Sequence, residues 1–205
     1  MRRQFSVVVE HTVNELNGIA CLSWDDVKAP KKEIFSTRSF GQRITDHQAL
    51  MFALVTHGAI VAKKLRQQHS LVKRLLIFAA SSPHDNQYYK KSLIYEFPVA
   101  TNSSSQIASA IGFVLQDIFQ SGIYFYRCGV GAITLEDQQY QQADLFTPAQ
   151  PSPLIMKCFD GVNHRYGQGT IALASEGKAE RWQMRRHFLS PQYTSCWRDI
   201  PKISC

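Results

Sequence analysis

The chain has 205 residues, 44% of them hydrophobic, so it can bury a core and is not globally disordered. Its net charge of +7 and its pI near 9.2 favour an anionic partner. No apolar run approaches the roughly 18 residues that a membrane-spanning helix needs, so we expect no contact with a membrane.

The positive charge is concentrated in one segment. Residues 31–80 hold nine Lys or Arg against two acidic residues, and their net charge of +7 equals that of the whole chain. A basic segment of a folded chain is most often a solvated face. A basic segment that coincides with a hydroxyl-rich strand is a better candidate for a binding surface.

Cysteine and histidine spacing argues against a metal site. The cysteines are never spaced as CxxC, and the histidines form no HxxxH or HxxH pair with a nearby carboxylate. We therefore expect no disulfide framework, no metal, no cofactor in this chain, and a reducing cytosol. The cysteines are Cys21, Cys128, Cys158, Cys196 and Cys205.

The first predicted element is a helix that ends at Gly18. Its start, close to Met1, has no capping residue, which suggests a sequence cut from something longer; a simple N-terminal helix fits the pattern nearly as well. Residues 23–32 follow as a polar linker. The apolar positions at helical spacing are Phe5, Val8, Val9, Thr12, Val13 and Leu16.

Four strands are predicted next, over residues 33–40, 71–80, 92–100 and 124–135. A Gly-containing turn should follow the first of them. The order of strands and helices is βαββαβ, a split ferredoxin-like arrangement, so we expect an α+β fold. Two helices would cover one face of a four-stranded antiparallel sheet and leave the other face open to a partner.

The two helices of this block show clear amphipathic patterns. Asp46 should cap the first, and Ser103 or Ser105 the second. Lys63 and Lys64 crowd the last turns of the first helix, where the helix dipole favours cations. The predicted buried positions are Leu50, Leu54, His57, Val61 and Leu65 in the first helix and Ile107, Ile111, Val114, Leu115 and Ile118 in the second.

The remaining third of the chain is less regular. Residues 138–153 are rich in glutamine and proline and are interpreted as a linker. A helix should open at Pro153, and a short strand is expected over Thr170–Ala174, which gives a small α/β tail. One face of that helix should carry Leu154, Ile155, Cys158, Phe159 and Val162. The terminal aromatic and basic residues are either a nucleic-acid surface or, more simply, a small core with a solvated rim.

The segment from Ile34 to Thr45 is the best candidate for a binding strand. It combines hydroxyl donors with arginines and one glycine, a mixture that suits nucleic-acid phosphates. Taken alone, an edge strand with a polar face is the commoner explanation.

Catalytic patterns are missing. There is no Walker loop, GxSxG, HExxH or close carboxylate pair able to hold two magnesium ions. Cys128 beside Arg127 is better interpreted as a buried structural cysteine than as a thiolate site. An independent enzyme on a ferredoxin-like fold would need a cluster that sequence spacing hides.

One linear signal lies in the linker. Leu145 and Phe146 are adjacent large apolar residues on a polar segment, preceded by Gln142. They either pack back on the domain or dock in a hydrophobic groove of a partner, with Gln142 making a polar contact.

Three separate stretches are similar to a known family. They are Glu10–Gly18, residues 37–45 (Thr-Arg-Ser-Phe-Gly-Gln-Arg-Ile-Thr), and Trp182–Arg186 together with Leu189–Thr194. In order and spacing they resemble the carboxy-terminal half of the UmuC-type Y-family DNA polymerases, which carry out translesion synthesis in the bacterial SOS response. The resemblance covers essentially the whole chain.

The resemblance implies a division of the chain. Residues 1–32 would be the end of a thumb-like helix and a linker, residues 33–137 the DNA-gripping little finger, residues 138–153 a linker with a clamp-binding-like peptide, and residues 154–205 a UmuC-type C-terminal region. The DNA-binding residues would be Thr37, Arg38, Ser39, Gly41 and Arg43, to which we add Lys63 and Lys64.

The same resemblance implies the partners. These are primer–template DNA, a sliding clamp bound through Gln142, Leu145 and Phe146, a UmuD′-like dimer and a RecA filament, in the bacterial cytoplasm near the nucleoid. Ala143 stands where the common clamp motif has leucine. The metal-binding palm carboxylates have no counterpart, so any magnesium would belong to a palm that this chain lacks, and no catalytic residue is expected.

The leading hypothesis is therefore a non-catalytic DNA-binding and partner-binding part of such a polymerase, acting in SOS DNA repair and mutagenesis. The alternative is a protein-interaction module for clamp, UmuD′ and RecA with negligible DNA binding of its own.

Overall fold

The computed structural model describes residues 6–21, 30–85, 87–140, 153–177, 190–194 and 196–200. The chain divides into two units, Met1–Lys31 and Lys32–Cys205. The first unit holds helix α1, Val7–Leu16, which confirms the predicted N-terminal helix. Gly18, with φ of 79°, follows it in the left-handed conformation that favours glycine.

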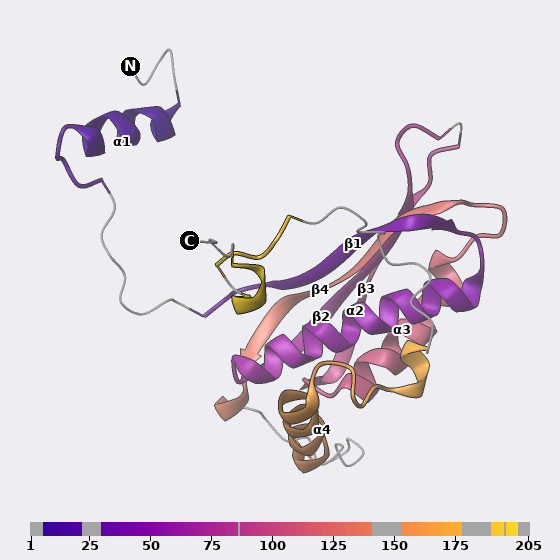
Figure 1. The fold of residues 1–205 in the computed structure, drawn as a ribbon. Helices are drawn as coiled ribbons and strands as arrows, with labels where there is room; N and C mark the ends of the chain where they lie inside the picture. Colours follow the sequence, from indigo (N-terminus) through magenta and orange to yellow (C-terminus); the bar gives the residue numbers. More distant parts are fainter. Residues whose placement is uncertain are drawn as a thin grey trace. The chain divides into compact units, whose positions relative to one another are not determined.

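The second unit has the predicted βαββαβ order (Figure 1). The strands are β1 (Ile34–Ile44), β2 (Ser70–Ser81), β3 (Lys90–Thr101) and β4 (Phe125–Asp137), and the helices between them are α2 (His47–Gln67) and α3 (Ser104–Ile118). The short helix η1 (Gln138–Tyr140) follows β4, and α4 (Pro153–Tyr166), η2 (Ala174–Glu176) and η3 (Trp197–Asp199) come later. The predicted α+β fold class is confirmed.

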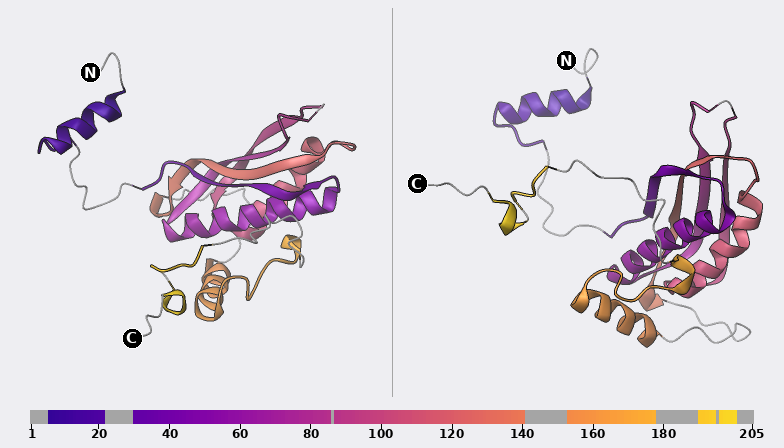
Figure 2. Two further views of the ribbon diagram at one scale, coloured as in Figure 1. Left: turned by 45° about the horizontal axis from the view of Figure 1, so that its top comes forward. Right: turned by 45° about the vertical axis from the view of Figure 1, so that its right-hand side comes forward.

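The four strands form one antiparallel sheet in the order β1-β4-β2-β3. β4 lies between β1 and β2, and β2 lies between β3 and β4. Each βαβ crossover is thus split by a strand of the other half. Both helices lie on the same side of the sheet, and none of α2, α3 and α4 covers the other side (Figure 2).

The core lies between the sheet and the two helices. Every predicted apolar position of α2 and α3 is buried, because the 3.6-residue period aligns these positions on the face toward the sheet. At Gly58 a Cβ atom would stand 2.6 Å from Ile111 Cδ1, so the glycine allows α2 and α3 to approach closely.

The caps follow the sequence prediction closely. The Asp46 side chain accepts a hydrogen bond of 2.8 Å from the Ala49 N–H and caps α2. Ser103, rather than Ser105, is the N-cap of α3, but its side chain accepts no capping hydrogen bond. Thr101 Oγ1 accepts from the Ser103 N–H instead.

The first strand is longer than predicted. It continues past Phe40 to Ile44, where we expected a turn, and its register with β4 shifts between Ser39 and Ile44. A bulge therefore replaces the predicted turn at Gly41. The hydrogen-bonded strand resumes because Ile44 is a core residue that pairs with Phe125.

The segment after the linker packs on the helix layer. Asp160 of α4 binds Arg66 of α2, with Nε–Oδ2 and Nη2–Oδ1 distances of 2.6 and 2.8 Å. Arg66 also donates to the Asn102 carbonyl at 2.8 Å. Near η2, Gly177 lies against the Phe52 ring of α2. Residues 153–177 thus add a third layer on the side away from the open face.

The predicted strand over Thr170–Ala174 is wrong. Within residues 153–177 the structure has no strand, and Ala174 begins the short helix η2. The Asn163 side chain accepts from the Ile171 N–H and donates to its carbonyl, so these backbone groups are satisfied without a neighbouring strand.

The buried side of α4 also differs from the prediction. Its buried residues are Met156 and Asn163, whereas Leu154 and Ile155 are 72% and 62% exposed. The helix is oriented by the Arg66–Asp160 pair and the Asn163 hydrogen bonds, and these polar contacts override the apolar pattern.

Candidate nucleic-acid interface

β1 is an edge strand, since among the described strands it pairs with β4 alone. Side chains alternate between the two faces of a strand, and Ile34 and Phe40 belong to the core. Arg38 consequently lies on the helix side of the sheet, while Thr37 and Ser39 lie on the open side. The hydroxyls and the first arginine of the predicted site therefore point to opposite faces.

Arg38 and Lys64 meet around a buried histidine. His57 of α2 is 3% exposed, and its Nδ1 lies 2.9 Å from Ser36 Oγ of β1. Burial, together with the smaller effects of the positive charges of Arg38 and Lys64, lowers the pKa of His57 to about 4. The imidazole is therefore neutral at pH 7, and both cations lie within its electrostatic reach.

Lys64 also contacts the edge strand directly. Its Nζ lies 3.4 Å from the Phe35 carbonyl oxygen. Among the described residues, Arg38 forms no ion pair and is exposed. Two of the predicted cations, distant in sequence, thus share the β1 edge, where a phosphate could meet both.

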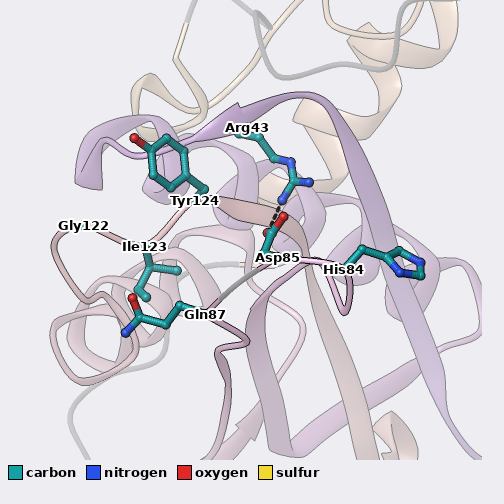
Figure 3. Close-up of a pocket in the computed structure, with 7 residues that line it drawn as sticks. All are labelled: Arg43, His84, Asp85, Gln87, Gly122, Ile123 and Tyr124. Carbon is teal, nitrogen blue, oxygen red and sulfur yellow. Dashed lines mark hydrogen bonds and ion pairs between the residues drawn. The ribbon is translucent and has the colours of Figure 1, made fainter.

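Arg43, unlike Arg38, has an acidic partner in the part of the chain that the structure describes. Its guanidinium pairs with Asp85 of the β2–β3 connection (Figure 3). It also lies over the Tyr126 ring, 5.2 Å from the centroid. The hydrogen bond from Arg43 holds the pKa of the Asp85 carboxyl below its usual range. The pair lines an open cleft of about 510 Å³ with His84, Gln87 and residues 122–124. Asp85 therefore neutralises Arg43 locally, whereas Arg38 has no acidic partner among the described residues.

The other predicted site residues fall in three places. Lys63 donates to Gln168 Oε1 at 2.8 Å, so it is engaged by the third layer. Gly41 lies in the bulged part of β1. Gln142, Leu145 and Phe146 lie outside the described residues, as do Trp182, Arg185 and Arg186. Of the terminal aromatics that are described, Tyr193 and Trp197 are 54% and 90% exposed.

The open face contains residues that the sequence reasoning missed. Phe35 of β1 and Phe78 of β2 lie against two glycines of β4, and Arg127 and Lys90 lie on the same face. In the sequence, the period-two alternation of Phe35, Thr37 and Ser39 was the signal that could have placed Phe35 on the open face.

Nothing in the described residues suggests catalysis at this surface. Cys128 is fully buried, and burial raises the pKa of its thiol, so it stays protonated and the structural interpretation holds. In the part of the chain described, no group of three or more His, Cys, Asp or Glu side chains could hold a metal ion. No helix there is long and apolar enough to cross a membrane.

Comparison with known proteins supplies the family. A family model described as the impB/mucB/samB family C-terminal domain matches residues 31–145, and a domain of unknown function, DUF4113, matches residues 154–203. The chain is 34% identical to Protein SamB of Salmonella typhimurium over 206 residues, which are 98% of this chain and 48% of SamB.

Two further likenesses were found. The chain is 32% identical over 208 residues to Protein UmuC of Salmonella typhimurium strain LT2, covering 99% of this chain and 49% of UmuC. The little finger domain of PolIV, solved in complex with the beta-clamp processivity factor, aligns at 12% identity and a TM-score of 0.37, covering 56% of this chain and 99% of that domain. The chain spans about half the length of the curated relatives it matches. Since the first family model covers more than half of its residues, the protein belongs to the impB/mucB/samB family.

Proposed function

We propose that this chain is a non-catalytic DNA-binding and partner-binding part of a UmuC-like Y-family translesion DNA polymerase, acting in SOS repair and mutagenesis in the bacterial cytoplasm. Its residues 33–137 would be the little finger, residues 1–32 the end of the thumb, and residues 154–205 the region that contacts a UmuD′-like dimer and RecA. The chain alone is not expected to polymerise DNA, because it has no counterpart of the palm carboxylates that would hold magnesium.

The observation that carries the proposal is the pair of cations at the β1 edge. Arg38 and Lys64 converge on the strand, and both act electrostatically on His57. Thr37 and Ser39 supply hydroxyl donors on the other side of the same strand. Such an arrangement suits backbone phosphates of primer–template DNA and carries no base-specific information.

The first test is a salt series. Affinity of the chain for primer–template DNA should fall steeply with salt, and each lost phosphate contact should reduce the slope of log K against log salt by roughly 0.9. Arg38→Ala should lower both affinity and slope, and Arg43→Ala should do so less because Asp85 already neutralises that guanidinium. Arg165→Ala, on α4, is the matched control for loss of one exposed arginine. A flat salt response, or equal effects of all three changes, would refute DNA binding at β1.

A second readout locates the contact. A phosphate beside Arg38 and Lys64 should offset their charge and raise the pKa of His57. Histidine ring signals followed by NMR across a pH titration, with and without DNA, would measure this. If the pKa of His57 does not change in the presence of saturating DNA, the DNA does not contact the β1 edge.

Clamp binding is a separate part of the proposal. It rests on the sequence of residues 142–146, in which Leu145 and Phe146 would enter a groove on the sliding clamp. Capture of the chain by immobilised clamp should be lost in the Leu145→Ala, Phe146→Ala double variant. If the double variant is still captured, residues 142–146 are not the clamp-binding peptide. That result would not bear on the proposal of DNA binding.

A further inference from the structure

Helix α4 is attached to the fold with an apolar side turned outward. Leu154 and Ile155 are 72% and 62% exposed, Cys158 is exposed and Val162 is half-buried. Residues 154, 158 and 162 stand four apart, so they form one row along the helix, about 12 Å long, with Ile155 beside it. These four residues are called the outer row. Single exposed apolar residues are normal on a protein surface, but a continuous row is typical of an interaction site.

Polar contacts hold α4 in this orientation. On its inner side, Asp160 accepts hydrogen bonds of 2.6 and 2.8 Å from Arg66 of α2. Asn163, also on the inner side, is hydrogen-bonded to both backbone groups of Ile171. Turning the helix to bury the outer row would break these contacts and leave the largely buried Arg66 without its carboxylate, which is costly. The fold therefore fixes the outer row at the surface.

Cations border the outer row. Lys157 lies three residues after the first member of the row and Arg165 three residues after the last, so each is a neighbour of the row on the helix surface. Both are exposed, and neither forms an ion pair within the described ranges. Asp160, the one acidic residue of α4, is bound to Arg66 on the inner side. The outward side of α4 is therefore apolar and positively charged.

This chemistry selects among partners. Nucleic acid would match the two cations, but it would leave the aliphatic side chains of the outer row in water, with no ring among them on which a base could stack. A second copy of the chain, docked by the same face, would bring the cations of both copies together with no acidic residue between them. A protein helix with an apolar row and acidic neighbours would cover the outer row and pair with both cations.

We propose that α4 is a docking site for an acidic amphipathic helix of a partner protein. The partner packs its apolar side on the outer row and places carboxylates beside Lys157 and Arg165. This assigns two roles to the first helix of the region that matches DUF4113, since its inner side attaches to α2 and its outer side binds the partner. The inference rests on the partner-binding part of the proposed function, which it narrows to one helix and one partner chemistry, and it does not depend on DNA binding.

The test uses the full chain and two fluorescein-labelled synthetic helices of roughly 21 residues, or three heptads, with leucine at the a and d positions. The acidic helix has glutamate at the flanking positions, and its basic twin has lysine there. Both are kept at nanomolar concentration, so that they do not pair with each other. In fluorescence anisotropy the acidic helix should bind about tenfold more tightly than the basic twin, because it exchanges two repulsive contacts for two attractive ones.

Two variants locate the site. Ile155→Ser should weaken binding of the acidic helix about fivefold and leave the thermal midpoint unchanged, because the side chain is exposed. Ile94→Ser is the matched control, since this isoleucine is 49% exposed on β3 of the sheet. The double change Lys157→Glu, Arg165→Glu should reverse the preference, so that the basic twin binds more tightly. The chain would still carry a net charge of +7 − 4 = +3, so its overall charge would continue to favour the acidic helix.

The inference is overturned if neither helix binds, if both bind equally, or if the preference for the acidic helix survives the double charge reversal. Tighter binding to phosphatidylserine vesicles than to the acidic helix would also overturn it, because the outer row would then be a membrane contact. A fall in the thermal midpoint on Ile155→Ser would show that the row belongs to the core. None of these results bears on salt-dependent DNA binding that is sensitive to Arg38→Ala, so the two proposals can fail separately.

Discussion

The two faces of the sheet are built from the same four strands but differ in what their side chains do. On the helix side, Leu75, Ile77 and Val130 are fully buried beneath α2 and α3. On the open side, the alternate positions mix aromatic, hydroxyl-bearing, charged and aliphatic side chains with two glycines of β4. The first face stabilises the fold, and the second contributes less to the core. Strand alternation thus lets one segment, Ile34–Ile44, serve both the core and a binding surface.

The largest expected difference between the faces is in stability. Leu54→Ala, at a fully buried position under the sheet, should lower the free energy of unfolding by about 2–5 kcal/mol. Phe35→Ala, on the open face, should cost roughly 1 kcal/mol or less, because the ring is already 42% exposed. Urea unfolding of the two variants measures both. Equal losses would mean that the open face also belongs to the core.

The next effect is a pH dependence that comes from the edge of the covered face. The folded-state pKa of His57 is about 4, below its ordinary value of 6.5, so on acidification the unfolded chain takes the proton first. The contribution of His57 to the free energy of unfolding is up to roughly 3 kcal/mol. It is fully present above pH 6.5 and is lost progressively as the pH falls to about 4. His57→Gln, which keeps an amide near Ser36, should flatten this part of the profile. If the free energy of unfolding depends on pH in the same way in the original chain and in the His57→Gln variant, His57 is solvated.

The smallest effect concerns the third layer, which belongs to the covered side. Asp160→Asn removes the charge that holds α4 to Arg66 and should cost about 1–2 kcal/mol. The loss should appear as faster hydrogen exchange in residues 153–177, with DNA affinity unchanged, because Asp160 contacts Arg66 and neither of the cations at the β1 edge. Glu136→Gln, an exposed carboxylate at the end of β4, is the control. A change in DNA affinity on Asp160→Asn alone would link this layer to the β1 edge.

The sequence determined the elements because periodicity is a local property. The positions Leu50 to Leu65 of α2, the Asp46 cap and the βαββαβ order all follow from residues close together in the chain. Errors appeared where a distant polar contact replaced a local pattern. The Asn163 side chain satisfies Ile171, so the expected strand after α4 did not form.

Only part of the candidate site could be predicted from local sequence patterns. Arg38 and Lys64 could be named from their residue types, but their convergence on His57 depends on how α2 packs against β1. The ion pair between Arg43 and Asp85 joins β1 to the β2–β3 connection, and sequence spacing carries no sign of it.

By itself, then, the sequence determined the helices and strands of the βαββαβ block, the apolar faces of α2 and α3, and the basic, hydroxyl-rich character of β1. The tertiary structure decided which cations are free, because ion pairs depend on spatial neighbours. It also decided that Phe35 and Phe78 lie over Gly131 and Gly129 on an uncovered face, because strand register, which sets these neighbours, is a property of the whole sheet.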